Sequence, residues 1–140
     1  MYAAVADVET RYGATCFALA GKLENGQVDS EAIARALEEA GSEINLTLQG
    51  RYAVPLEPVP PVIRRVCVDI AVGALPQNGA GEATLYERRA RDARNLLASL
   101  AKGEISLGAD TPPAPAPSSG GGIAYAGPVS EFRTRLDDFV

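Results

Sequence analysis

The sequence predicts a small all-α bundle of four to five helices that carries a linker and an extended C-terminal arm. Apolar residues recur at spacings of three and four over three long segments, as on the buried face of a helix. Aromatic residues make up only 6% of the chain and alanine is abundant, so that helices can approach closely. The composition changes abruptly at Gly108. We therefore expect a helical domain at residues 1–107, a linker at 108–122 and an arm at 123–140.

Length and charge limit the classes of function. A chain of 140 residues fits one domain, and 46% apolar residues suffice for a core. The net charge of −5 argues against a protein that grips nucleic acid, which usually has a basic surface. No secretory leader opens the chain and no run of about 18 apolar residues occurs, so we expect a soluble protein made in a cytoplasm. Cys16 and Cys67 lie in apolar helical contexts and are expected to be small buried side chains.

Residues 2–13 are predicted to form a short opening helix that stops at Gly13. Three of its side chains share one apolar face: Val5, Val8 and Tyr12. A second short helix is expected at residues 14–20, anchored by Phe17, and a turn at residues 21–27.

The next helix is predicted at residues 30–49, with Asp29 as its N-cap. Its apolar face is formed by residues at spacings of four and three: Ile33, Leu37, Gly41, Ile44 and Leu48. Because a glycine inside a helix costs roughly 1 kcal/mol against alanine, we expect another backbone to pass close to Gly41. Glu31 and Arg35 are four residues apart and predict an ion pair on the outer face.

Four prolines follow within seven residues: Pro55, Pro58, Pro60 and Pro61. They predict an extended elbow from Val54 to Val59, and then a helix that begins with a proline in its first turn. This helix, at residues 62–75, is the most apolar of the chain and is expected to be central. Its predicted inward side chains are Ile63, Val66, Cys67, Ile70 and Leu75.

The last helix of the domain is predicted at residues 82–102, with Gly103 as its C-terminal stop. Five residues form its inward stripe: Tyr86, Ala90, Ala93, Leu97 and Leu100. Leu85 and Leu96 are expected to broaden this stripe. The alternation in residues 104–107 predicts a short edge strand.

The C-terminal arm is joined to the domain by a proline-rich and then glycine-rich linker, which builds no core of its own. The arm regains apolar residues, which we expect to dock on a partner. They are Ile123, Tyr125, Val129, Phe132, Leu136 and Phe139.

No constellation for catalysis is recognisable. Histidine is absent, and no phosphate-binding loop or nucleophile motif occurs. We therefore expect no enzyme activity, no catalytic residues, no cofactor and no metal site. Arg88, Arg91 and Arg94 form a basic stripe on the last helix, partly offset by the i,i+4 pairs Glu87–Arg91 and Arg88–Asp92. This stripe is a solvated face, a contact to an acidic neighbouring subunit or, least favoured, a nucleic-acid contact.

Several motifs in order resemble the head–tail connector (neck or adaptor) family of Mu-like phages and prophages. The chain opens with Met-Tyr-Ala-x-Val-Ala-Asp-x-x-x-Arg-Tyr-Gly, and residues 28–45 match the family's acidic helix. The most specific part reads Leu-x-Gly-Arg-Tyr-Ala-Val-Pro-Leu from Leu48, followed by Val-Pro-Pro-Val-Ile-Arg-Arg-Val-Cys-Val-Asp-Ile-Ala from Val59. Leu-Ala-Lys-Gly-Glu-Ile-Ser-Leu-Gly from Leu100 and the tail with Phe132, Leu136 and Phe139 also fit. Residues 75–83 depart from the family, in which a longer helix with an aromatic residue is expected.

The resemblance implies a structural role in the virion neck, assembled in the host cytoplasm. Such proteins form a ring, usually of twelve subunits, beneath the portal protein, and the ring extends the DNA channel. Implied partners are the portal, neighbouring copies and a tail terminator or other neck protein; DNA passes without specific binding, and no membrane is involved. Candidate inter-subunit contacts are Arg51, Arg88, Arg91, Arg94, Glu38 and Glu39. The alternative is a helical module, unrelated to virions, that captures a partner with its tethered C-terminal segment.

Overall fold

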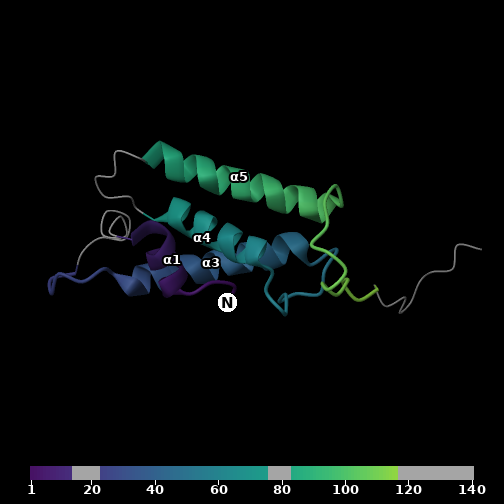
Figure 1. Cartoon of the computed structure of the whole chain (residues 1–140), viewed down its shortest axis with the longest axis horizontal. Helices are drawn as coiled ribbons and strands as arrows, with labels where there is room; N and C mark the ends of the chain where they lie inside the picture. Colours follow the sequence, from purple (N-terminus) through teal and green to yellow (C-terminus); the bar gives the residue numbers. More distant parts are fainter. Residues whose placement is uncertain (14–22, 76–82, 117–140) are drawn as a thin grey trace, which may run out of the picture.

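The protein is a helical bundle in the computed structural model, which describes residues 1–13, 23–75 and 83–116 (Figure 1). The helices in these ranges are α1 (Val5–Tyr12), α3 (Ser30–Leu48), α4 (Pro61–Ala74) and α5 (Ala83–Lys102). The described residues contain no strand, and an isolated antiparallel bridge joins Tyr52 to Pro113. The predicted all-α class is therefore confirmed.

Helix α4 is the centre of the bundle. It packs against both α3 and α5, and α1 contacts α3 and α4 (Figure 1). All residues from Val66 to Val72 are buried, so α4 is covered on almost every side. The prediction of a central helix here is confirmed. Val68, Asp69 and Val72 are buried as well, although the apolar spacing did not predict them to point inward.

The starts of α3 and α4 follow from two local signals. The Asp29 carboxylate accepts the N–H of Ala32 at 3.1 Å, which satisfies one of the free donors in the first turn. Pro61 is the first residue of α4, and Pro60 is its N-cap. Proline suits this position because its fixed φ is helical and the first turn needs no N–H acceptor.

The end of α5 has the paired hydrogen bonds of a Schellman motif. Gly103 has φ of 84°, its N–H donates to Leu100 at 3.3 Å, and the Glu104 N–H donates to Ser99 at 3.0 Å. Glycine is favoured there because a Cβ disfavours positive φ. The edge strand predicted for residues 104–107 is wrong, because these residues complete this turn and then lead away from the helix.

The core matches the predicted helical stripes closely. All five inward residues predicted for α5 and all five for α4 are buried. Val8 of α1 is completely buried, with Val5 and Tyr12 partly buried against it. Leu85 is an error of prediction, since it is 38% exposed and lies outside the stripe.

The residues before α1 form a buried N-terminal segment that sequence periodicity did not predict. Tyr2 and Ala3 are 4% and 5% exposed. The Tyr2 hydroxyl donates to the side chain of Asn45 on α3 and accepts the N–H of Leu56 at 3.0 Å. Through these two hydrogen bonds, Tyr2 connects the start of the chain to α3 and to the elbow.

The elbow is bent, so the predicted extended run from Val54 to Val59 is wrong. Bends occur at residues 54–55 and 57–58, and the peptide bonds before Pro55 and Pro58 are cis. Leu56 is 1% exposed and its N–H is held by Tyr2. Burial of this leucine turns the chain towards the core, which outweighs the preference of the prolines for an extended chain.

The expected close backbone approach occurs at Gly73 instead of Gly41. A Cβ on Gly41 would meet only the Tyr2 ring, at an ordinary contact distance of 3.8 Å. A Cβ on Gly73 would lie 2.5 Å from the Ala90 Cβ and 3.4 Å from the Tyr86 carbonyl oxygen. Gly73 is therefore what allows α4 and α5 to pack so closely.

Several predictions lie outside the described residues. They are the short helix at 14–20 with Phe17, Cys16, the linker beyond residue 116 and the arm. The domain boundaries at 107/108 and 122/123 stay predictions. The early linker residues Pro112 and Ala114 pair with Arg51–Ala53 through two main-chain hydrogen bonds, of 3.1 and 2.9 Å.

Candidate inter-subunit surfaces

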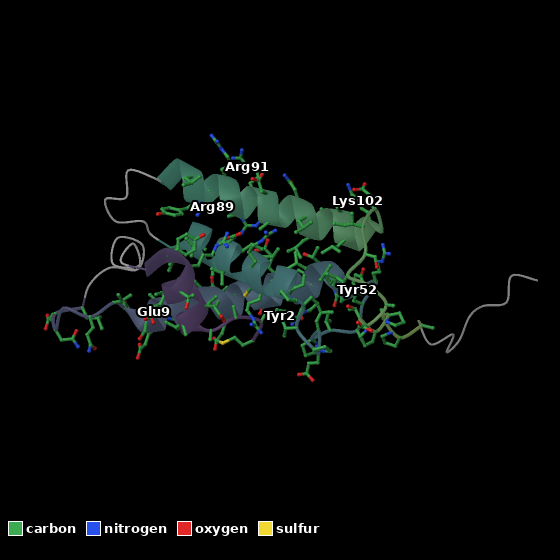
Figure 2. The ribbon with its side chains drawn as sticks, viewed as in Figure 1. Tyr2, Glu9, Tyr52, Arg89, Arg91 and Lys102 are labelled. Atoms are coloured by element: carbon green, nitrogen blue, oxygen red, sulfur yellow. The ribbon has the colours of Figure 1, made fainter. Side chains whose placement is uncertain are left out.

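Arg88 and Arg91 lie on the outer side of α5, away from the core. Both are exposed, and Figure 2 shows Arg91 and Lys102 projecting from the side of α5 that faces away from α4. Neither predicted i,i+4 pair of this helix forms an ion pair within the described residues, whose ion pairs lie elsewhere. These guanidinium groups therefore face solvent without an ionic partner in their own described domain.

Arg94, the third arginine of the predicted stripe, is engaged within the domain. Its Nε and Nη2 atoms donate to the two carboxylate oxygens of Glu43 on α3, at 2.6 and 3.1 Å. These hydrogen bonds raise the pKa of Arg94. Both side chains are well exposed, 49% and 38%, so the pair contributes at most about 1 kcal/mol. The pair links α5 to α3 within one molecule.

Arg51 is also engaged within the domain. Its guanidinium carbon lies 5.6 Å from the centre of the Tyr52 ring, within cation–π range. Its Nη1 atom donates to the Leu100 carbonyl oxygen at 3.4 Å, near the C-terminal end of α5. A cation is favourable at this end of a helix, where free carbonyl groups gather. The structure thus gives Arg51 an internal stabilising role.

Glu38 and Glu39 are exposed on the outer side of α3. Glu38 borders two shallow depressions, of about 320 and 380 Å³, one towards Arg35 and one towards Met1. The ion pair predicted between Glu31 and Arg35 is absent, because the Arg35 Nε donates to the Glu31 main-chain oxygen at 3.4 Å. The carboxylates of this face are therefore not neutralised by that arginine.

A charge cluster around the buried carboxylate of Asp69 lies where α1, α4 and α5 meet, and it was not among the predictions from the sequence. Asp69 is 8% exposed and accepts the Tyr12 hydroxyl at 3.0 Å. Arg11 reaches the same carboxylate with Nε at 3.0 Å and Nη2 at 3.3 Å. Tyr12 also packs edge-on against Tyr86, with 5.7 Å between ring centres.

The signal for this cluster was present in the sequence. Asp69 is a lone carboxylate in a run of apolar residues, and a buried charge requires a partner. Beside it is a cleft of about 180 Å³, towards which Arg89 points from α5 (Figure 2). Its lining residues are Arg11, Arg65, Val66, Asp69, Arg89, Asp92, Ala93 and Leu96. The cluster joins three helices, and we assign it a stabilising role.

Other site predictions are not tested by the described residues. The six apolar residues of the arm lie beyond them. Within the described ranges no group of three or more His, Cys, Asp or Glu side chains is placed to hold a metal ion. None of the described helices combines the length and apolar character needed to cross a bilayer. The absence of enzyme activity stays a prediction.

Comparison with known proteins gives two findings. Residues 2–125 match the family model described as Bacteriophage Mu, Gp36. The Mu-like prophage FluMu protein gp36 of Haemophilus influenzae Rd is 36% identical over 85 residues. The aligned region covers 61% of this chain and 59% of that relative, so it spans less than two thirds of the relative's length.

Proposed function

Because the chain belongs to the bacteriophage Mu Gp36 family, we propose that it is a structural virion protein, a connector (adaptor) subunit between head and tail. In this proposal several copies form a ring beneath the portal protein. The ring extends the DNA channel and provides the docking surface for the next neck or tail component. The observation that carries the proposal is the family match, which extends over residues 2–125 and so includes the whole described domain.

Two physical features support the proposal. The domain has a continuous core of its own, so it can serve as a rigid building block. The chain has a net charge of −5, and an acidic wall repels the phosphates of DNA instead of binding them. DNA can then pass through a channel of such subunits without binding to the channel wall. The apolar arm at residues 123–140 is proposed to dock on the portal or on an adjacent subunit.

Electron microscopy of particles made without this protein tests the proposal. We expect DNA-filled heads that lack tails, because the docking surface for the tail would be missing. Supplying the protein in trans should restore tailed particles. Complete, infectious virions in its absence would overturn the proposal.

Fractionation separates this function from its alternative, a binding module that works outside the virion. A connector must copurify with particles at a constant number of copies per particle. A module that captures a partner with its tethered arm would remain in the soluble fraction. Failure to find the protein in purified particles would favour this alternative.

A further inference from the structure

Two oppositely charged helix faces remain without ionic partners in the described domain. The first, which we call the basic face, is on the outer side of α5 and consists of Arg88, Arg91 and Lys102. The second, the acidic face, is on the outer side of α3 and consists of Glu31, Glu38 and Glu39. All six side chains are exposed, and none of them takes part in the ion pairs of the described residues. Arg35 also lies on the acidic face, which still leaves three carboxylates against one guanidinium group. Glu87 and Asp92 are exposed at the two borders of the basic face, and neither forms an ion pair with its arginines in the described domain.

Helix geometry explains why each face points outward. On α5, residues 88, 91, 95 and 102 are opposite the buried stripe that begins with Tyr86. On α3, residues 31, 38, 39 and 42 are opposite the buried stripe that begins with Ile33. The charges that link α3 to α5 inside one molecule belong to Arg94 and Glu43, at the side where the helices meet.

The two faces point outward from the bundle in different directions, one on α5 and one on α3. Helix α4 packs against both α3 and α5, and Figure 1 shows α5 along one edge of the bundle and α3 along the other. The basic and acidic faces therefore cannot meet within one chain. A second copy can satisfy the basic face of the first by placing its own acidic face against it.

Helix direction favours a repeating arrangement. The chain colours in Figure 1 show that α3 and α5 run the same way along the bundle. Packing α5 of one copy beside α3 of the next therefore needs no reversal of the molecule, only a shift and a modest rotation. After one such contact, the first copy still has its acidic face free and the second copy its basic face, so the pair can bind a further copy at either end. A contact between two different faces repeats head to tail, and it generates a ring when the rotations close.

We infer that the basic face of α5 docks on the acidic face of α3 of a second copy of this chain. The inference rests on the proposed function for its biological setting, because it names the subunit contact of the ring. Leu46 on α3 and Leu85 on α5 are 69% and 38% exposed and supply apolar area near these faces. Of the six residues that the sequence suggested as inter-subunit contacts, this contact uses four: Glu38, Glu39, Arg88 and Arg91.

Cysteine cross-linking of the full-length protein tests which faces meet. Ser42 and Asn95 are exposed, and each lies about one turn beyond a charged residue of its face, Ser42 beyond Glu38 and Asn95 beyond Arg91. The chain that carries both Ser42→Cys and Asn95→Cys should give a ladder of dimers, trimers and higher species with a short bismaleimide at high protein concentration. Each single variant should remain monomeric, since its added cysteine would face no second cysteine. The unmodified chain, which retains Cys16 and Cys67, gives the background.

Two outcomes of cross-linking would overturn the inference. One is a chain with both cysteines that remains monomeric like the background. The other is a dimer from either single variant alone, because this would mean that like faces meet.

Charge reversal tests the electrostatic basis. One variant carries Arg88→Glu with Arg91→Glu, and the other carries Glu38→Arg with Glu39→Arg. Each alone should weaken self-association by at least about tenfold, because like charges then meet across the contact. An equal mixture should recover the association of the unmodified protein, since each reversed face now finds an opposite one. Sedimentation velocity at low salt measures this, and no recovery in the mixture would contradict the inference.

Particle assembly separates failure of this inference from failure of the proposed function. If the charge-reversed proteins restore tailed particles as well as the unmodified protein does, the contact is wrong although the connector role stands. If particles are complete without any copy of the protein, the connector role itself fails. We expect neither variant to restore tails alone, and co-expression of both to restore them.

Discussion

Asp69 is a carboxylate inside the most apolar helix of the chain, and its partners explain how it is tolerated. It is 8% exposed, and it receives hydrogen bonds from Tyr12 and Arg11 of α1. Because Arg11 is 37% exposed, most of the benefit comes from satisfying a buried acceptor and less from the ion pair itself. The cluster fixes the position of the short helix α1 on the bundle.

We expect Asp69→Ala to lower the free energy of unfolding by about 1–3 kcal/mol, since it removes the acceptor of two α1 side chains. Asp92→Ala is a matched control, because Asp92 borders the same cleft but is exposed. We expect the control to change stability by less than about 0.5 kcal/mol. Urea denaturation followed by circular dichroism measures both. Equal effects of the two changes would contradict a structural role for Asp69.

Cys67 is completely buried on α4, and its thiol lies 3.7 Å from the Leu37 carbonyl oxygen. Burial raises the pKa of this thiol from 9.0 to about 11. Above pH 9 the thiol ionises in the unfolded chain while it stays protonated in the folded chain. The unfolded state then binds fewer protons, so stability falls as the pH rises, and the loss is complete near pH 11.

The expected loss between pH 9 and pH 11 is roughly 2–3 kcal/mol, because one pKa unit corresponds to about 1.4 kcal/mol. Burial also raises the pKa of Tyr2, which adds a loss at more alkaline pH. The test is therefore a difference between unmodified protein and Cys67→Ala, each unfolded in urea at several pH values. The variant should be less stable at pH 7 but should lose less stability up to pH 11. Parallel curves would show that Cys67 does not cause the alkaline loss.

At the scale of elements, the contact between α4 and α5 depends on Gly73, which has no side chain to separate the two helices. The Ala90 methyl group on α5 occupies the space in which a Cβ on Gly73 would lie, at 2.5 Å. Neither group can rotate away, since a methyl group next to the backbone has no alternative position. Adding a Cβ therefore requires the two helices to separate, which would disturb the largest interface of the bundle.

We expect Gly73→Ala to destabilise the protein by about 1–3 kcal/mol, because overpacking outweighs the gain in helix propensity. Gly41→Ala is the matched control in α3. Its Cβ would meet Tyr2 at an ordinary contact distance, so we expect a gain of up to about 1 kcal/mol. Ala90→Gly should be less harmful in the Gly73→Ala chain than in the unmodified chain. Thermal unfolding of the four variants measures this, and additive effects would contradict the close approach.

The helices were predictable because their signals are local. Apolar spacing determined the inward stripes of α4 and α5, and Asp29, Pro61 and Gly103 marked helix ends through their own backbone and side-chain chemistry. Errors arose where a distant residue decides the conformation. The elbow bends because Leu56 is buried and is held by Tyr2, 54 residues earlier. The position of a glycine in the sequence did not show which two helices approach closely, because the approach also depends on the side chain of the facing helix, here Ala90.

The candidate contact residues were predictable only as a set. Sequence spacing placed six charged side chains on helices or at the elbow, but it did not show which of them already had partners. Arg94 pairs with Glu43, and Arg51 lies on Tyr52 and reaches Leu100. Both arrangements depend on the packing of α5 against α3 and on the path of the elbow. The tertiary structure shows that Arg88, Arg91, Glu38 and Glu39 are exposed and form no ion pair within the described residues.

At the scale of the whole molecule, the chain after α5 returns to the elbow before the arm begins. The Leu107 N–H donates to the Tyr52 hydroxyl at 3.2 Å. Further on, Ala53 and Ala114 each donate one main-chain hydrogen bond across the Tyr52–Pro113 bridge. The first part of the linker is thus attached to the elbow through residues 112–114.

Two truncations test where the domain ends. A chain of residues 1–107 loses the two hydrogen bonds of the bridge, so we expect it to stay folded and helical but to be less stable by about 1–2 kcal/mol. A chain of residues 1–116 keeps the bridge and should match the full-length protein in urea denaturation. In particle assembly both should fail to restore tails, because both lack the arm. If the 1–116 chain instead unfolds globally, residues beyond 116 complete the domain's own core, and the arm cannot then serve to dock on a partner.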